Sequence, residues 1–327
     1  MTITPPIRPI EIASFLDQEG WGEASAACFP GDFSKRRYAR LTKSDGSTAI
    51  LMDADTDQKS DIFVKVAAEL RHLGIAAPEI YAAAPERGLV LLEDFGTRNL
   101  GAALDAKENP KPFFLRAVEI LAKLHKSFRS SPNLGVALPL FNKDLFTGQA
   151  ELFLDSYFPY HKGREVTKAE RQDFCAAWQA TLRPLDLLPQ SLLLRDFMPD
   201  NLMVLPSGAL GVLDFQDAGL GPIAYELASL CEEVRRSGSF AILPEMITHY
   251  RKTSESALSQ TDLLRACTIL SAQRHMRILG IIAQLAIQTG RKDKLDYLPR
   301  IRGHLSRILE EPYLIPVHEW VERTSIL

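Results

Sequence analysis

Hydrophobic and polar positions in the first part of the chain follow the pattern of a small sheet with one helix. A short amphipathic helix is expected at residues 7–20, and residues 26–54 show the pattern of strands. Within that stretch, the turn-forming sequence Ser-Asp-Gly-Ser at 44–47 separates segments 37–41 and 48–52, which predicts a hairpin. Residues 60–73 then show the helical period. The apolar positions on the predicted helix face are Phe63, Val66, Ala67, Leu70 and Leu73.

The pattern changes near residue 95, after two more expected strands at 79–83 and 88–93. Beyond that point the chain reads as mostly helical, with short strands expected at 192–194, 202–205 and 210–214. The expected helices are 113–128, 142–160, 167–183, 223–236, 240–254, 261–287 and 296–310. These elements predict an α+β fold of two lobes: a small β-rich lobe at residues 1–94 and a larger helical lobe at 95–327.

Composition limits the function classes that fit this pattern. The chain has 327 residues, 46% hydrophobic and 24% charged, with a net charge of −3, so it lacks the basic excess typical of nucleic-acid binding. It contains no apolar run of about 20 residues and no signal-peptide pattern at its N-terminus. Its four cysteines form no CxxC pair, which favours reduced core thiols. We therefore expect a cytoplasmic protein with no nucleic-acid or membrane partner.

The candidate chemistry lies in two neighbouring segments. Asp196 is followed five residues later by Asn201, and Asp214 comes thirteen residues after that, beside apolar strand-like residues. Phosphoryl-transferring enzymes of the protein-kinase type need such a trio: one Asp receives the proton of the attacking hydroxyl, and the Asn and the second Asp hold Mg²⁺ against the ATP phosphates. An isolated Asp after a strand is usually a turn former, so the prediction depends on the spacing of all three residues.

Other polar residues have both a functional and an ordinary interpretation. The segment 33–38 occupies the place of a phosphate-covering loop without being glycine-rich, and it is otherwise an exposed basic turn. Glu69 either forms the ion pair of a kinase helix or lies on a helix surface. Asp217 is either a substrate residue or a solvated loop acid, and Glu226 either caps a helix or takes part in catalysis.

Longer stretches give the chain a resemblance to a known family. It resembles the aminoglycoside phosphotransferase family of small-molecule kinases, from Phe33 through Trp320, and within that family it is similar to bacterial anomeric kinases for N-acetylmuramate and N-acetylglucosamine. The resemblance rests on Ser-Lys-Arg-Arg-Tyr-Ala-Arg-Leu at 34–41, Ile-Leu-Met-Asp-Ala at 50–54, Leu-Leu-Glu-Asp-Phe-Gly at 91–96, Leu-Asp-Phe-Gln-Asp-Ala at 213–218 and Ala-Gln-Arg-His-Met-Arg-Ile-Leu-Gly at 272–280.

The resemblance implies a protein-kinase-like fold, ATP and Mg²⁺ as cofactors, and phosphorylation of the anomeric hydroxyl of a cell-wall amino sugar in peptidoglycan recycling. It implies that Asp196 is the catalytic base, that Asn201 and Asp214 bind the metal, and that segment 92–95 holds the adenine. We expect a monomer acting on a small molecule. The candidate nucleotide-binding residues are Ser34, Lys35, Arg37, Arg40, Glu69, Glu93 and Phe95, and the candidate substrate residues are Asp217 and Arg274.

Two positions depart from the family pattern. Leu194 stands where the catalytic loop usually begins with a His, and the strand at 48–52 lacks the phosphate-binding Lys. We expect Lys35, Arg37 or Arg40 to supply that positive charge. Two alternatives stay open: a kinase for another hydroxyl substrate, such as an aminoglycoside, choline, homoserine or another sugar, and a pseudokinase that binds nucleotide without turnover.

Overall fold

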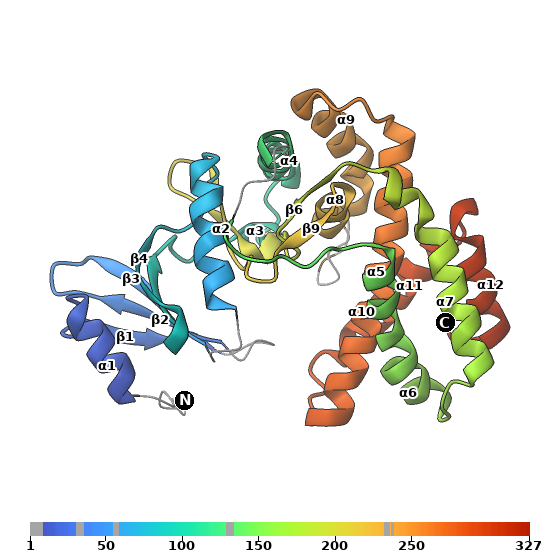
Figure 1. The fold of residues 1–327 in the computed structure, drawn as a ribbon, viewed down its shortest axis with the longest axis horizontal. Helices are drawn as coiled ribbons and strands as arrows, with labels where there is room; N and C mark the ends of the chain where they lie inside the picture. The colour runs from blue at the N-terminus through green and yellow to red at the C-terminus, as the bar shows by residue number, and fades with distance from the viewer. Residues whose placement is uncertain (1–8, 31–35, 55–58, 129–133, 232–235, 237–238) are drawn as a thin grey trace. The chain divides into compact units, whose positions relative to one another are not determined.

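The computed structural model describes residues 9–30, 36–54, 59–128, 134–231, 236 and 239–327 (Figure 1). They belong to two compact units. The first unit comprises Met1–Glu108, Ser131–Ala137 and Pro199–Ala218, and the second comprises Asn109–Ser130, Leu138–Met198 and Gly219–Leu327. The predicted lobe boundary between residues 94 and 95 stays a prediction, because these units follow contacts and not chain order.

A five-stranded antiparallel sheet forms the centre of the first unit, in the order β1-β2-β3-β5-β4. The hairpin expected around residues 44–47 is confirmed: Asp45 Oδ1 accepts a hydrogen bond of 2.8 Å from the Ser47 backbone N–H, and Gly46 has the left-handed φ of 87° that the turn needs. The strands are β1 (Ser25–Cys28), β2 (Arg37–Thr42), β3 (Thr48–Asp53), β4 (Ile80–Ala84) and β5 (Leu89–Glu93).

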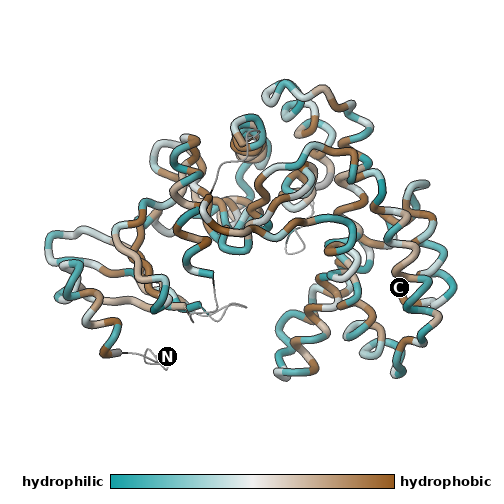
Figure 2. The backbone as a smooth tube through the Cα atoms, viewed as in Figure 1, coloured by the Kyte–Doolittle hydropathy of each residue, from teal (hydrophilic) through white to brown (hydrophobic). Residues whose placement is uncertain are grey.

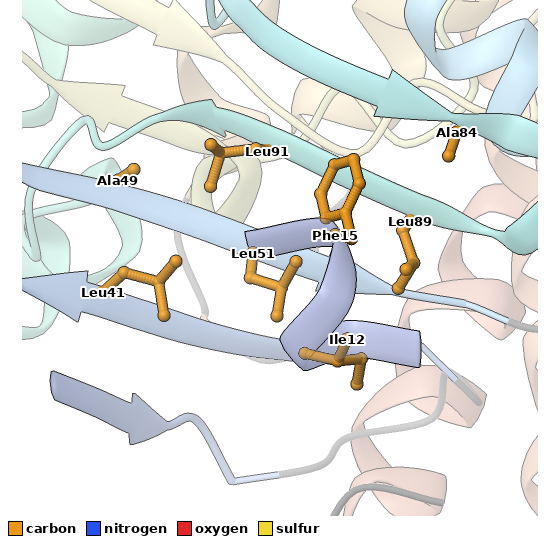
Figure 3. Close-up of a cluster of buried hydrophobic side chains, with 8 residues drawn as sticks. All are labelled: Ile12, Phe15, Leu41, Ala49, Leu51, Ala84, Leu89 and Leu91. Carbon is orange, nitrogen blue, oxygen red and sulfur yellow. The ribbon is translucent and has the colours of Figure 1, made fainter. Parts of the chain in front are cut away.

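Helix α1 (Pro9–Gln18) covers one face of this sheet (Figure 3). Ile12 and Phe15 of α1 form a buried cluster with side chains of β2, β3 and β5, among them Leu41 and Leu51. Because side chains alternate along a strand, Arg37 shares the α1 face with Leu41. Tyr38 and Arg40 therefore lie on the opposite face.

Helix α2 (Ser60–His72) confirms the helical period read from the sequence, since the predicted apolar positions Phe63 and Val66 are buried on one side. Gly74 follows the helix with φ 67° and donates a hydrogen bond of 2.8 Å to the Arg71 carbonyl, which is the expected C-terminal stop.

The first unit also contains residues from later in the chain. They form a two-stranded ladder of β7 (Leu202–Val204) and β8 (Leu210–Val212), preceded by the 3₁₀ turn η5 (Pro199–Asn201). The ladder is joined to earlier segments by backbone hydrogen bonds, including one of 2.8 Å from Val212 N to the Ala76 carbonyl. Helix α3 (Leu100–Asp105) begins at its cap Asn99, whose side chain donates to the Asp200 carbonyl at 3.0 Å.

The second unit is mostly helical, with one short antiparallel strand pair, β6 (Gln190–Leu193) and β9 (Gly219–Pro222). Its helices are α4 (Pro110–Ser127), α5 (Lys143–Leu152), α6 (Phe158–Lys162), α7 (Lys168–Leu182), α8 (Ala224–Cys231), α9 (Leu243–Ser254), α10 (Gln260–Thr289), α11 (Leu298–Leu309) and α12 (Ile315–Thr324). Short helical turns of this unit lie at Arg183–Leu187, Ser239–Ile242, Leu295–Tyr297 and Pro312–Leu314, and the first unit has one at Pro85–Arg87.

Helix α10 packs against several helices of the second unit. Gly280 lets α5 approach closely, because a Cβ at this position would lie 2.4 Å from the Leu152 carbonyl carbon. The chain expected to be one helix at 142–160 contains a π-helical turn at Phe153–Tyr157, where Phe153 stacks with Phe174 at 6.2 Å between ring centroids. Hydrophobic and hydrophilic positions mix along these helices (Figure 2), and none of the described helices is long and apolar enough to cross a membrane.

Candidate active site

Asn201 and Asp214 lie next to each other in the first unit, at the end of the β7–β8 ladder where Leu202 pairs with Val212. The Leu213 backbone N–H donates a hydrogen bond of 2.9 Å to the Asn201 carbonyl. This bond holds the chain after β8 against the start of β7. The Asn201 side-chain amide nitrogen lies 3.3 Å from Asp214 Oδ2. The structure therefore brings these two predicted metal ligands together.

The Asp214 backbone has the left-handed φ of 62°, which costs a non-glycine residue about 1–3 kcal/mol and persists only where the surroundings enforce it. Two side chains next along the chain supply that support. Gln216 donates a hydrogen bond of 2.8 Å to Asp214 Oδ1. Phe215 stacks on Phe63 of α2 with 4.7 Å between ring centroids and 6° between ring planes. The Asp214 carboxylate is consequently held in a fixed direction.

The donor chemistry of this pair fits Mg²⁺. The ion prefers hard oxygen ligands, and in kinases it is held by one or two protein side chains together with phosphate oxygens. Asp214 offers a carboxylate and Asn201 an amide oxygen, provided that its amide turns away from its present hydrogen bond. No group of three or more His, Cys, Asp or Glu residues suited to a metal occurs in the described part of the chain, and a kinase-type Mg²⁺ site does not require one.

Asp196 belongs to the second unit, in the loop that follows β6. Leu194, at the position of the family's His, is buried with 1% of its surface exposed. Arg195 has a left-handed φ of 73°, and its guanidinium lies over the Phe141 ring at 5.5 Å from the centroid. The Arg195 backbone N–H donates a hydrogen bond of 2.8 Å to Glu226 Oε1. Glu226 thus holds the strained backbone directly before Asp196.

Glu226 is fully buried in the first turn of α8. Burial raises the pKa of this carboxyl group from 4.5 to about 7, and the negative charge of Asp196 acts in the same direction. The backbone hydrogen bond from Arg195 and the positive charge of Arg274 oppose this rise in pKa. The sequence suggested helix capping or catalysis for Glu226, and the structure gives it a third role as the anchor of the Asp196 loop.

Arg274 lies in α10 and is also buried, with 6% of its surface exposed. Its Nη1 donates a hydrogen bond of 2.9 Å to the Tyr225 hydroxyl, and its guanidinium is 5.1 Å from the centroid of that ring. Arg274 is therefore a buried cation beside Glu226. Its predicted contact with the substrate stays a prediction.

The predicted phosphate-binding residues occupy different places. Ser34 and Lys35 lie outside the described residues. Arg37 forms an ion pair with Asp53 on the sheet face that α1 covers. Arg40, on the other face, makes a two-pronged contact with Asp94, with distances of 2.6 and 2.9 Å from its Nε and Nη2, and also donates to the Gly96 carbonyl.

The remaining predicted nucleotide- and substrate-binding residues of the first unit mostly contact other residues of the protein. Glu69 is half-buried on α2 and has no ion pair within the described residues. Glu93 accepts a hydrogen bond of 3.1 Å from the Glu79 backbone N–H. The Phe95 ring packs against Gly211 of β8, where an added Cβ would lie 2.5 Å from the ring. Asp217 forms an ion pair of 2.9 Å with Lys59.

Sequence reasoning gave no separate role to Arg36 and Tyr38. Arg36 directly precedes β2 and is buried, with 8% of its surface exposed. It donates a side-chain hydrogen bond to the Tyr38 hydroxyl. Burial and then the nearby charge of Asp214 raise the pKa of Tyr38, while Arg36 acts in the opposite direction. The sequence signal was the cluster of basic residues at 35–37, which does not say which of them points inward.

Sequence comparison matches most of the chain to a known enzyme family. Residues 26–263 match the model of the phosphotransferase enzyme family. The chain is 31% identical to an N-acetylmuramate/N-acetylglucosamine kinase of Neisseria meningitidis serogroup B, over 85% of this chain and 83% of the relative. It is also 31% identical to a protein of the same name from Pseudomonas aeruginosa, over 92% and 90% of the two chains.

The fold is similar to that of solved kinases. A choline/ethanolamine kinase family protein from Mesorhizobium loti superposes with a TM-score of 0.65 at 14% identity, over 97% of this chain and 100% of that one. The predicted protein-kinase-like α+β fold and the predicted phosphotransferase activity on hydroxyl groups are both confirmed. The chain belongs to the phosphotransferase enzyme family.

Proposed function

We propose that this protein is an ATP- and Mg²⁺-dependent kinase that phosphorylates the anomeric hydroxyl of N-acetylmuramate and N-acetylglucosamine. The observation that carries the proposal is the agreement among the curated relatives. Four of them, at 26–31% identity over 85–95% of this chain, have the name N-acetylmuramate/N-acetylglucosamine kinase. The reaction would take place in the cytoplasm, where ATP is available, and would return cell-wall sugars to metabolism.

Asp196 would act on the sugar hydroxyl. Its carboxylate would accept a hydrogen bond from that hydroxyl and direct it toward the γ-phosphorus. It would take the hydroxyl proton as the new O–P bond forms and the bond between the γ-phosphorus and the β,γ-bridging oxygen breaks, which releases ADP. A base of this kind contributes about 10²- to 10⁴-fold to the rate when it is held in position. The hydrogen bond from Arg195 N to Glu226 supports such positioning, since it fixes the backbone next to Asp196.

Asn201 and Asp214 would hold Mg²⁺ through their side-chain oxygens. The bound ion would neutralise charge on the phosphate oxygens. The contribution of the protein is to present a carboxylate whose direction Gln216 and Phe215 fix. Segment 92–95 would hold the adenine through its backbone, next to the contact between Arg40 and Asp94.

A substrate panel tests the proposed acceptor. Purified protein is incubated with Mg·ATP and, separately, N-acetylmuramate, N-acetylglucosamine, an aminoglycoside, choline and homoserine, and products are followed by ³¹P NMR. We expect anomeric sugar phosphate from the two amino sugars and none from the other acceptors. Asp196→Ala should abolish the product, whereas Asp173→Ala, which removes an exposed acid paired with Arg323, should leave it unchanged.

Three outcomes would count against the proposal. Turnover only on choline, homoserine or an aminoglycoside would move the protein to another substrate class. Binding of Mg·ATP without turnover on any acceptor would favour the pseudokinase alternative. Product formation undiminished in Asp196→Ala would remove Asp196 from its role as the base.

A further inference from the structure

The second unit contains a surface cavity that shares no lining residue with the candidate active site. Its volume is about 450 Å³, which is in the range of pockets that hold small molecules. The π-helical turn, α6, the turn at Leu295–Tyr297 and α11 contribute its walls. Two tyrosines, a histidine and an arginine share the lining with two leucines and a proline. The cavity thus combines aromatic, aliphatic and basic surface.

Helix α10 gives the position of the Asp196 loop within this unit. The backbone directly before Asp196 is hydrogen-bonded to α8, and the start of α8 is hydrogen-bonded to Arg274 of α10. The Asp196 loop is therefore level with Arg274. Helix α10 continues for fifteen residues beyond Arg274 to Thr289, about 22 Å along its axis.

The cavity belongs to that later part of α10. Phe146 of α5 accepts a hydrogen bond of 2.9 Å from Gln273, and Leu152 at the end of α5 lies against Gly280, so α5 and α10 run in the same direction. The chain continues from Leu152 through Tyr157 into α6, which contacts α10 (Figure 1). The lining residues therefore lie beyond the level of Gly280, away from Asp196.

Tyr157 gives the cavity an unused hydrogen-bonding group. Its side chain is 1% exposed, and its hydroxyl makes no hydrogen bond with any residue that the structure describes. The ring is held in place by His161, which stacks on it with 5.7 Å between ring centroids and 8° between ring planes. A buried polar group without a partner costs about 1–3 kcal/mol. A ligand oxygen that reached this hydroxyl would remove that cost.

Arg302 gives the cavity its positive charge. This half-buried residue forms no ion pair within the described part of the chain, and the lining described there includes no Asp or Glu. Burial, and then the nearby charges of Arg302 and Lys162, lower the pKa of His161 from 6.5, so the His161 ring is uncharged at pH 7. The cavity therefore has a cation without a protein counter-charge.

We propose that this cavity is a second ligand site, separate from the catalytic one, for a small organic anion that joins a ring to a carboxylate or a phosphate. Arg302 would pair with the anion, since a guanidinium presents two parallel N–H groups to either kind of oxygen pair. The ring would pack against Tyr160 and Leu298, which favours such a molecule over a free ion. An oxygen of the ligand would accept the hydrogen bond from Tyr157. This inference does not depend on the proposed function.

The test uses four small molecules that separate the ring from the charge. Phenyl phosphate and benzoate carry both, inorganic phosphate carries no ring, and benzyl alcohol carries no charge. Wild type, Arg302→Gln, Tyr157→Phe and Leu298→Trp are titrated with each molecule in a calorimeter. The control is Arg307→Gln, which removes an exposed cation of α11 outside the cavity lining. Thermal melting of each variant reports whether it is folded.

We expect wild type to bind phenyl phosphate or benzoate more tightly than inorganic phosphate and benzyl alcohol. Arg302→Gln should weaken this binding by about 10- to 100-fold, the effect of losing charged hydrogen bonds. Tyr157→Phe should weaken it by about 2- to 10-fold without lowering the melting temperature, because the hydroxyl has no partner to lose. Leu298→Trp should abolish binding by filling the cavity, and Arg307→Gln should bind like wild type.

The tighter of the two ring-containing anions shows whether the site prefers phosphate or carboxylate. The inference is overturned if wild type binds neither of them more tightly than inorganic phosphate, or if Arg302→Gln keeps full affinity. Equal losses in Arg302→Gln and Arg307→Gln would also overturn it, since the attraction would then come from the general charge of α11. If Arg302→Gln does not fold, Tyr157→Phe and Leu298→Trp decide.

Turnover of N-acetylglucosamine with Mg·ATP shows whether the site is separate from the catalytic one. We expect Arg302→Gln to phosphorylate this neutral sugar at the wild-type rate when no other ligand is present. A loss of turnover in this folded variant would place the cavity in the acceptor site and overturn the inference. Failure of the proposed function looks different, because wild type itself would then show no turnover while binding of the ring-containing anions remained.

Discussion

Replacing Glu226 by Gln perturbs the buried carboxyl group that holds the loop before Asp196. Glu226 Oε1 accepts a hydrogen bond of 2.8 Å from the Arg195 backbone N–H, and the side chain is 0% exposed. Glutamine has nearly the same shape and keeps a carbonyl acceptor for that N–H. The substitution therefore removes the ionisable group while leaving the anchor in place.

The size of the effect follows from the pKa of Glu226, which burial raises from 4.5 to about 7. One pKa unit corresponds to 1.36 kcal/mol, so ionising this group costs the folded protein about 3 kcal/mol. Between pH 4.5 and pH 7, Glu226 keeps its proton in the folded state and has lost it in the unfolded state. The contribution of Glu226 to the free energy of unfolding therefore falls as pH rises from 4.5 to 7 and stays low above 7. The Gln variant has no such loss.

Urea unfolding of wild type and Glu226→Gln at pH 5, 6, 7 and 8 measures this difference. We expect the variant to have an advantage of about 1 kcal/mol at pH 5 that grows to about 3 kcal/mol at pH 8. Glu319→Gln, at an exposed position of α12, is the matched control and should show no pH-dependent difference. An advantage of Glu226→Gln that did not change with pH would refute the reasoning, because Glu226 would then ionise as readily in the folded protein as in the unfolded chain.

Three further substitutions test individual contacts. Asn201→Ala should raise the Mg²⁺ concentration needed for half-maximal activity, which a Mg²⁺ titration of the activity would show. Its melting temperature should change little. Gly211→Ala places a Cβ about 2.5 Å from the Phe95 ring and should lower the free energy of unfolding by about 1–3 kcal/mol, which denaturant unfolding would detect. Tyr225→Phe removes the hydroxyl that accepts from buried Arg274 and should cost about 1–3 kcal/mol in the same assay.

Local patterns predicted the elements whose stability depends on near neighbours in the sequence. The helical period of Phe63 and Val66 was sufficient for α2, and Asp45 with Gly46 was sufficient for the β2–β3 turn. Strand β9, Gly-Leu-Gly-Pro, was not predicted because its strand character comes from pairing with β6. The π-helical turn at Phe153–Tyr157 was missed for a similar reason, since it depends on packing against distant helices such as α10.

In the candidate site, too, the sequence did not reveal contacts between residues that are far apart in the chain. The spacing of Asn201 and Asp214 identified a pair that the fold brings to 3.3 Å. Glu226 looked like an ordinary first-turn acid because its partner, the Arg195 N–H, is far away in the sequence. Arg36 could not be told apart from its basic neighbours, since its burial depends on tertiary packing around the start of β2.

A single-turnover measurement of phosphoryl transfer tests the central claim most directly. Wild type and Asp196→Asn are mixed with limiting Mg·[γ-³²P]ATP and saturating N-acetylmuramate, and labelled sugar phosphate is measured over time. The account predicts transfer to the anomeric oxygen by wild type and a rate about 10²- to 10⁴-fold lower in Asp196→Asn, with ATP binding retained. Equal rates in the two proteins, or label that reaches only water, would contradict it.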